Sequence, residues 1–279
     1  MTSAVWFITG ASSGLGRTLA STVLEHGDRV VATAHNAAAL DDLRGRRDED
    51  VVRLALDVTD PGSVRAAVTE AVERAGAIDV LVNNAGHGLI GALEKLSDAQ
   101  IRRILDTNVF GTLSVTRAVL PHMRARRRGH IVAMSSVGGV VGNPGHALYA
   151  TSKFAVEGMF EALAGEVAPL GIRVTIVEPG RFRTDFFGRS MEYAEQIEDY
   201  RDTPAGALRE RFTAQHGDQP GDPRKAAEAI IAAVRDDSSP LRLPLGQAAV
   251  TRIRAKLEAQ LADLQAWEKV SLDTAYPDA

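Results

Sequence analysis

The sequence of 279 residues contains no cysteine. This absence excludes disulfide bonds, thiol nucleophiles and thiolate metal ligands, and a chain of this length can build a core without such cross-links. Histidine is the next candidate ligand, but the seven histidines show neither an HExxH motif nor a paired spacing on one helix face. We therefore expect no metal site.

Long apolar runs and an excess of positive charge are also missing. No stretch approaches the roughly 20 apolar residues of a membrane span, and the first residues lack the basic and apolar regions of a signal peptide. Lysine and arginine number 32 against 36 aspartates and glutamates, which gives a formal net charge of −4. Because phosphate binding requires a basic face, we expect no nucleic-acid partner. These observations predict a cytoplasmic protein without a membrane span.

Short apolar runs alternate with longer helical patterns along the chain. The runs are continuously apolar, which is typical of parallel strands covered on both faces. Repeated strand–helix alternation predicts an α/β fold with one doubly wound, Rossmann-type parallel sheet of about seven strands flanked by helices, and no domain boundary is visible within 1–279. The expected strands cover residues 5–9, 29–34, 51–56, 79–83, 130–135, 173–178 and 241–245, and the longest expected helices cover 97–120, 148–170 and 247–269.

The strand–helix rhythm breaks between residues 181 and 222. This segment is rich in Arg, Asp, Gly and Phe without a clear period, so we interpret it as an irregular substrate loop past the carboxyl end of the sheet, where α/β proteins bind ligands. The C-terminal helix carries an apolar stripe that first of all indicates core packing; covering the pocket, packing on a neighbouring subunit, or neither are alternatives. The stripe consists of Val250, Ile253, Leu257, Leu261 and Leu264.

A glycine-rich turn joins the first strand to the first helix. Its glycines allow a tight turn and close approach of the backbone to a pyrophosphate, and the helix N-terminus that follows offers free N–H groups. The spacing departs from the GxGxxG fingerprint, so a plain strand–helix turn is the alternative. The candidate phosphate-binding residues are Gly10, Ser12, Ser13, Gly14, Leu15 and Gly16.

The end of the second expected strand should meet the adenosine ribose of a dinucleotide. NAD needs an acidic residue there for the ribose 2′-hydroxyl, whereas NADP needs a cation for the 2′-phosphate. Ala34, His35 and Asn36 supply no acid, and His35 is a cation only part of the time. The segment therefore favours NADP(H) over NAD(H).

Several motifs occur in a fixed order and together resemble the classical short-chain dehydrogenase/reductase family. Residues 9–16 resemble its TGxxxGxG turn, residues 83–86 match its NNAG motif, and residues 149–153 match YxxxK. Asn108 resembles the asparagine that the family carries on a helix. The similarity covers about residues 3–187.

Two further positions complete the resemblance. Ser136 precedes Tyr149 by 13 residues, the separation expected of the family, which favours Ser136 over the adjacent Ser135. The turn after the sixth strand resembles the family's PGxxxT motif, with Pro179, Gly180 and Thr184.

The resemblance implies an oxidoreductase that interconverts a ketone or aldehyde and an alcohol by hydride transfer. Tyr149 would be the general acid and base, because Lys153 lies on the same helix face and an ammonium lowers the phenol pKa from about 10. By the same resemblance, Lys153 also binds the nicotinamide ribose. Ser136 would hold the substrate oxygen, and Asn108 would hold a water or the helix geometry.

Two other functions remain alternatives on the same fold. One is an epimerase or multi-step reductase that uses the bound cofactor for another reaction. The other is a non-catalytic NADP-binding regulator, which the presence of all four catalytic candidates argues against.

The resemblance also implies a cofactor half over about residues 1–130 and a catalytic and substrate half over about 131–279. Asp57 would contact adenine, although an Asp–Thr turn capping the helix at Pro61 is an alternative. Thr184 would bond the nicotinamide carboxamide. Beyond the glycine-rich turn, the implied cofactor-binding residues are His35, Asn36, Asp57, Val58, Asn84, Ala85, Gly86, Tyr149, Lys153, Pro179, Gly180 and Thr184.

The remaining candidates concern the substrate and the assembly. Phenylalanine and methionine near the expected cleft indicate an apolar carbonyl substrate, with a loop that packs its own small core as the alternative. The family commonly assembles through its two long helices, so we expect a homodimer or homotetramer through 97–120 and 148–170. Candidate substrate-binding residues are Ser136, Leu89, Val137, Val140, Asn143, Phe182, Phe186, Phe187, Met191 and Tyr193, with His87 and His146 near the cleft.

Overall fold

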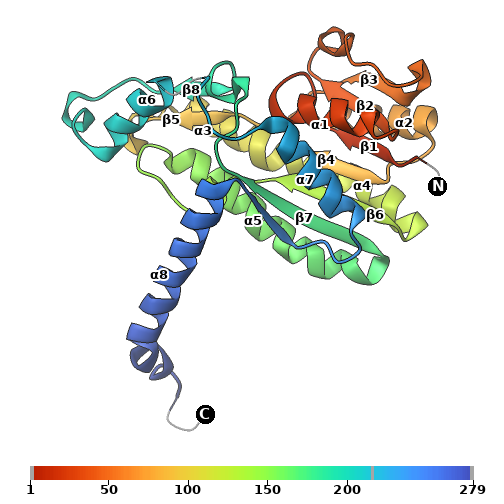
Figure 1. Cartoon of the computed structure of the whole chain (residues 1–279). Helices are drawn as coiled ribbons and strands as arrows, with labels where there is room; N and C mark the ends of the chain where they lie inside the picture. The colour runs from red at the N-terminus through yellow and green to blue at the C-terminus, as the bar shows by residue number, and fades with distance from the viewer. Residues whose placement is uncertain (1–2, 215–216, 277–279) are drawn as a thin grey trace.

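A seven-stranded parallel sheet forms the centre of the computed structural model, which describes residues 3–214 and 217–276 (Figure 1). The strand order is β3-β2-β1-β4-β6-β7-β9. This confirms the doubly wound sheet predicted from the sequence, and each strand falls within one or two residues of its expected range. The strands are β1 Val5–Ile8, β2 Arg29–Ala34, β3 Val51–Ala55, β4 Val80–Asn83, β6 Gly129–Met134, β7 Ile172–Pro179 and β9 Arg242–Leu245.

Both faces of the sheet are buried beneath helices, as the continuously apolar strands predict. In β1, the neighbours Trp6 and Phe7 belong to two different core clusters, because successive side chains of a strand point to opposite faces. Leu19 and Ile230 join the Trp6 cluster, whereas Phe160 joins the Phe7 cluster. Helices α1, Gly14–Glu25, and α7, Pro223–Arg235, cover the first face; α2, Pro61–Ala75, α4, Thr112–Arg126, and α5, Ala147–Val167, cover the second.

The long helix expected over residues 97–120 is a composite of three segments. Ser97 caps α3, Asp98–Leu105, because its side chain accepts the Gln100 N–H. A π-helical segment, Asp106–Gly111, separates α3 from α4 and contains Asn108. Such segments are rare, and they often occur at functional sites.

The expectation of irregular structure over residues 181–222 is wrong in part. Strand β8, Met191–Tyr193, pairs in parallel with β5, Gly88–Ile90, to form a second, two-stranded sheet, and α6 covers Pro204–Ala214. Both strands have three residues, too few for a periodic pattern. The short 3-10 helices of the chain are Ala37–Leu40, Asp48–Asp50, Leu93–Lys95, Val137–Gly139, Ala168–Leu170, Asp185–Phe187 and Glu198–Tyr200.

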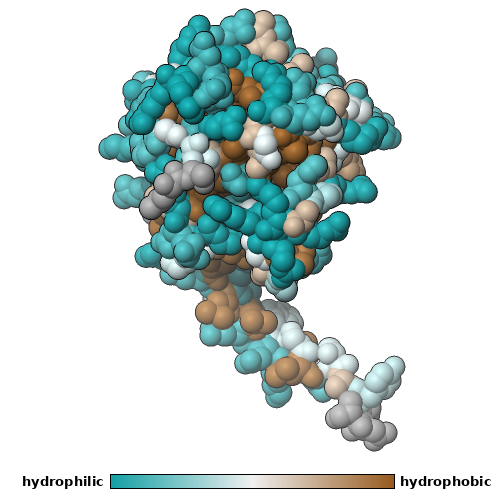
Figure 2. All heavy atoms as spheres, turned by 90° about the vertical axis from the view of Figure 1, so that its right-hand side faces the viewer, coloured by the Kyte–Doolittle hydropathy of each residue, from teal (hydrophilic) through white to brown (hydrophobic). Residues whose placement is uncertain are grey.

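Helix α8, Gln247–Leu272, begins against the body and then projects away from it (Figure 1). Only Ala249 and Ile253 of this helix are buried. The core-packing interpretation of its stripe is therefore wrong beyond the first turns. An apolar stripe indicates that one face of a helix tends to be buried, but it does not identify what buries that face. Figure 2 shows hydrophobic side chains along the projecting part. Of the predicted stripe, Leu257, Leu261 and Leu264 are 55%, 54% and 61% exposed, and Val250 in the first turn is 41% exposed.

In the part of the chain that the structure describes, no helix combines the length and the apolar character needed to cross a bilayer.

Candidate active site

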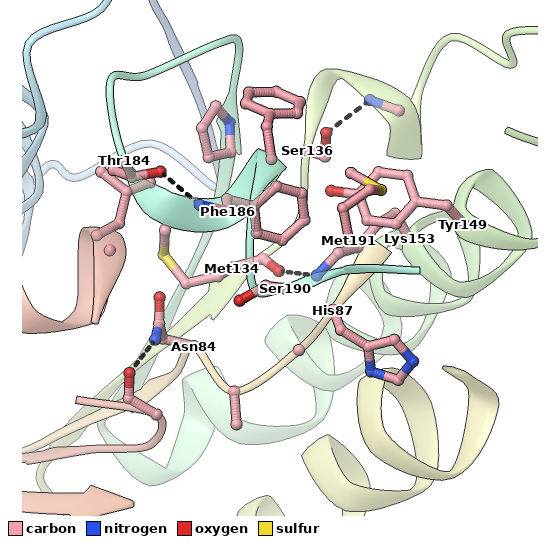
Figure 3. A pocket seen from close by; sticks show the side chains of 18 of the residues that line it. Asn84, His87, Met134, Ser136, Tyr149, Lys153, Thr184, Phe186, Ser190 and Met191 are labelled. Carbon is pink, nitrogen blue, oxygen red and sulfur yellow. Dashed lines mark hydrogen bonds between the residues drawn. The ribbon is translucent and has the colours of Figure 1, made fainter. Parts of the chain in front are cut away.

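A cavity of about 1260 Å³ opens at the carboxyl ends of the central strands (Figure 3). In parallel α/β sheets, ligands bind at this edge. The residues that follow β1, β2, β4, β6 and β7 all contribute to its lining. Candidates that line it are Gly10, Ser12, Ser13, Gly14, Leu15, His35, Asn36, Val58, Asn84, Ala85, Gly86, Ser136, Val137, Asn143, Tyr149, Lys153, Pro179, Gly180, Phe182, Thr184, Phe186, Phe187 and Met191.

The glycine-rich turn has a backbone that only glycine adopts easily. Gly10 and Gly14 have φ angles of +64° and +58°, in the left-handed region. Gly16 does not line the cavity, but a Cβ atom there would lie 2.3 Å from Nδ2 of Asn84. Ser13 makes no side-chain cap to α1, so the N–H groups of the first turn remain available to an anionic ligand.

Thr9 ties this turn to the NNAG segment, a role that sequence analysis missed. Its buried hydroxyl accepts the N–H groups of Asn84 and Ala85, both at 2.9 Å. Asn84 Nδ2 in turn donates to the carbonyl oxygens of Thr9 and Gly10 at 2.9 and 3.1 Å. Two loops that are distant in sequence therefore form one rigid wall of the cavity.

The far end of the cavity, at β2, contains His35 and Asn36 but not Asp57. Oδ1 of Asp57 accepts the N–H and hydroxyl of Thr59 at 2.9 and 2.7 Å, and these bonds hold the pKa of Asp57 below its usual range. Asp57 thus forms the Asp–Thr turn considered above, whereas the cap of α2 is Asp60. Val58 and Thr59 are the residues of this turn that line the cavity.

Ser136, Tyr149 and Lys153 converge where β6 ends and α5 begins. Tyr149 is 8% exposed, and burial raises its pKa to about 12, while hydrogen bonding with Ser136 opposes that rise. The sequence predicts a phenol pKa nearer neutrality, but in this geometry the desolvation of the buried phenol is the largest effect and raises the pKa. Ser136 Oγ also accepts the Gly138 N–H at 3.0 Å.

Lys153 lies one turn beyond Tyr149 and is also buried. Its Nζ donates to the Met134 carbonyl at 2.8 Å and lies 5.9 Å from the centre of the Tyr149 ring (Figure 3). Burial lowers the pKa of Lys153 to about 8, and the charge of Glu157 opposes this change. The ammonium is therefore held beside the phenol by a backbone carbonyl.

Asn108 supports the site from behind and does not line the cavity. Its Nδ2 donates to the His87 carbonyl and to Ser152 Oγ at 2.9 and 3.0 Å, and its Oδ1 accepts the His87 N–H at 3.0 Å. A Cβ atom at Gly86 would lie 2.9 Å from Asn108 Oδ1. The π-helical segment therefore fixes the loop after β4 against α5.

The substrate side of the cavity combines aromatic and charged residues. Phe186 lies 6.1 Å from the Tyr149 ring, and His146 lies 5.1 Å from it, centre to centre. The segment also packs its own small core, in which Phe186 and Phe187 adjoin buried Met191 and Leu208. The alternative interpretation, a loop that packs its own small core, therefore holds for these residues.

Some substrate candidates lie elsewhere, and other lining residues were missed. Leu89 is 1% exposed and packs in a core cluster with Leu148, and Val140 and Tyr193 do not line the cavity. No periodic signal marks the α6 contribution, because Leu208 is its one buried side chain among those described. The lining residues that sequence analysis missed include Met134, Arg181, Leu208, Arg211, Phe212, Ala248, Ala249 and Arg252.

Among the described residues, no group of three or more acidic or histidine side chains is arranged to hold a metal ion.

Known proteins resemble this chain along most of its length. Residues 4–194 match the family model described as short chain dehydrogenase. "Oxidoreductase BOA17" of Botryotinia fuckeliana is 38% identical over 272 residues, which covers 97% of this chain and 99% of that protein.

Two solved structures share the fold. A short-chain dehydrogenase from Streptomyces avermitilis superposes with a TM-score of 0.91 at 41% identity and covers 99% of this chain and 100% of its own. A short-chain dehydrogenase/reductase from Burkholderia phymatum, in complex with NAD, has a TM-score of 0.79 at 25% identity and covers 92% of this chain and 95% of its own. From the family match and the full-length relative, the chain belongs to the short-chain dehydrogenase family.

Proposed function

We propose that this protein is an NAD(P)H-dependent reductase that converts a ketone or aldehyde with an apolar body to an alcohol. The observation that carries the proposal is the convergence of Ser136, Tyr149 and Lys153 on one cavity whose other end is a glycine cradle. The solved relative from Burkholderia phymatum is in complex with NAD, which supports a nicotinamide cofactor for this chain too.

The residues present fit such a cofactor. The left-handed glycines and the uncapped start of α1 suit a pyrophosphate, and Asn84, Ala85 and Gly86 offer a close approach to a ribose. Pro179, Gly180 and Thr184 line the cavity beyond them, and Thr184 Cβ lies 3.8 Å from where a Cβ of Gly14 would be. When bound, the nicotinamide supplies the hydride.

Tyr149 then delivers the proton to the carbonyl oxygen of the substrate. A phenol whose pKa is raised to about 12 stays protonated at neutral pH, which is the form that a reductase needs. The Ser136 hydroxyl donates to the same oxygen and stabilises the charge that develops there. The Lys153 ammonium, held by Met134, stabilises the phenolate left behind.

We further propose that NADP(H) is preferred to NAD(H). The end of β2 offers His35 and Asn36 to the adenosine ribose and no carboxylate. Because a carboxylate would repel a 2′-phosphate, its absence favours NADP. Replacement His35→Asp should therefore shift the ratio of kcat/KM values toward NADH, and His35→Arg should shift it toward NADPH.

The test of the reaction is oxidation of NADPH or NADH at 340 nm against a panel of aryl and alkyl ketones and aldehydes. Tyr149→Phe should lower kcat at least about a hundredfold, because general acid catalysis contributes roughly 10²–10⁴. Binding of NADPH to this variant, measured by fluorescence, should persist. Turnover equal to that of the wild type in Tyr149→Phe would refute the mechanism.

We also propose a homodimer or homotetramer assembled through the two long helices. Phe110 of the π-helical segment and Phe154 of α5 are 59% and 46% exposed, large apolar groups on these helices. Burial of such groups against a second copy would remove apolar surface from water.

A further inference from the structure

Three arginines meet at the substrate end of the cavity. Arg181 follows β7, Arg211 lies on α6 and Arg252 lies near the start of α8, and all three line the cavity. Partial burial lowers the pKa of Arg252, and the charges of Arg181 and Arg211 lower it further. Arg252 therefore lies within electrostatic reach of the other two guanidinium groups.

The charges of Arg211 and Arg252 are not balanced by acidic groups among the described residues. The other lining arginines are paired, Arg103 with Glu192 at 3.2 Å and Arg189 with Asp185 at 3.0 Å. Glu192 is the one carboxylate in the described lining. Neither Arg211 nor Arg252 forms an ion pair with a described residue, and Arg252 donates to the neutral Oδ1 of Asn143 at 2.5 Å.

A continuous run of rings connects the cluster to the reacting phenol. Tyr149 and His146 have ring centres 5.1 Å apart, and His146 and Phe212 are also 5.1 Å apart. Phe212 directly follows Arg211 and packs on Phe187 with centres 4.7 Å apart. A wall of rings thus extends from the proton donor to α6, the helix that carries Arg211.

We propose that the substrate of this enzyme carries, beyond its carbonyl and its apolar body, an anionic oxo group that Arg211 and Arg252 bind. A carboxylate or a phosphate monoester matches the fork of a guanidinium, which can donate two parallel hydrogen bonds to it. Binding would also replace the mutual repulsion of the arginines with attraction. This inference rests on the proposed reductase function, because the carbonyl end of the substrate is placed at Tyr149.

The experiment compares ketones that differ only at the distant end. The substrates are ω-oxo-ω-phenylalkanoates of increasing chain length, their methyl esters, and the corresponding phosphate monoesters. At the best chain length the wild type should show a kcat/KM roughly ten- to a hundredfold higher for an anionic form than for the ester, since a hydrogen bond to a charged group is worth about 1.5–3 kcal/mol. The carboxylate and phosphate arms identify which anion is preferred.

Variants of the arginines test whether these residues cause the preference for an anionic substrate. Arg211→Gln and Arg252→Gln should each lose most of the anion preference, through a KM that rises more for the anionic substrate than for its ester. Arg252→Lys should retain part of the preference, because it keeps the charge and loses the fork. Arg254→Gln is the control, since Arg254 lies on the same helix, is exposed and does not line the cavity.

A binding measurement keeps this inference separate from the reductase function. Calorimetric titration with phenylalkanoates that lack the ketone should show tighter binding than titration with the matching alcohols, and Arg252→Gln should abolish the difference. Equal binding of acid and alcohol, or a defect confined to the KM for NADPH, would overturn the inference. Anion-selective binding without reduction of any ketone would refute the reductase function alone.

Discussion

Glu178, at the end of β7, has a buried carboxyl group that lacks hydrogen-bond partners and a cation of its own. It is 1% exposed, and neither carboxylate oxygen has a hydrogen-bond partner among the described residues. Arg242 lies 3.7 Å from Glu178 but 3.2 Å from Glu157 and 2.9 Å from Glu161, so one cation is shared by three acids. Burial and then the charge of Glu157 raise the pKa of Glu178 to about 7, against the attraction of Arg242.

We predict that Glu178→Gln stabilises the protein at pH 8 and has little effect at pH 4.5. The folded state binds this proton more tightly than the unfolded state, whose pKa is near 4.5, so the wild type loses stability as the pH rises from about 4.5 through 7. The expected gain at pH 8 is up to about 3 kcal/mol. Urea unfolding at a series of pH values measures it, with Glu166→Gln as the control, because Glu166 is exposed on α5 and forms no ion pair with a described residue. Parallel pH profiles for wild type and variant would contradict the prediction.

The sequence predicts which candidate residues lie together, but it does not predict the hydrogen bonds that they form. A spacing of four places Tyr149 and Lys153 on one helix face without the structure. Nothing local indicates that Lys153 donates to the Met134 carbonyl or that Thr9 holds Asn84. Those contacts depend on which strands lie side by side. The same packing buries Tyr149, and this burial raises its pKa.

Elements with a strong period were predicted well, and those held by tertiary contacts were not. The strands of the main sheet appear as continuous apolar runs, and Ser97 and Asp60 mark helix starts by their capping chemistry. Strands β5 and β8 pair only with each other, over three residues each. Helix α6 lacks an apolar stripe, so Arg211 and Phe212 could not be assigned to the cavity.

The start of α1 and the interior of α5 should respond oppositely to the same substitution. Gly16→Ala places a Cβ 2.3 Å from Asn84 Nδ2 and 2.6 Å from the Gly10 carbonyl, so it should weaken NADPH binding at least about tenfold and lower stability by roughly 1–3 kcal/mol. Gly165→Ala meets nothing within 4 Å and should stabilise by up to about 1 kcal/mol. Fluorescence titration and thermal unfolding measure the two effects. Unchanged NADPH binding in Gly16→Ala would contradict the assignment of this turn.

Large apolar side chains are exposed on the long helices and on the projecting part of α8, and Leu93 is exposed elsewhere. If the long helices form the interface, then the double substitution Phe110→Ser and Phe154→Ser should give particles near the chain mass of 29.8 kDa. The wild type should give at least twice that mass in light scattering at micromolar concentration.

The matched control for this assembly test is the double substitution Leu257→Ser and Leu261→Ser on α8, which replaces side chains of similar exposure. It should leave the wild-type mass unchanged. Dissociation by the α8 substitutions alone would move the interface to that helix, and a monomeric wild type would refute the assembly.

The π-helical segment at Asp106–Gly111 implies a compromise between folding and catalysis. Its wide turn contains one residue more than an α-helical path would need, and that surplus aims Asn108 at His87 and Ser152. Deleting one residue there would restore the regular ladder and turn every side chain on one flank by about 100°, the angle between successive residues of an α-helix. A shorter, more regular helix would thus be the better folding unit and the poorer scaffold, so the surplus residue is the kind of stability sacrifice that active sites retain.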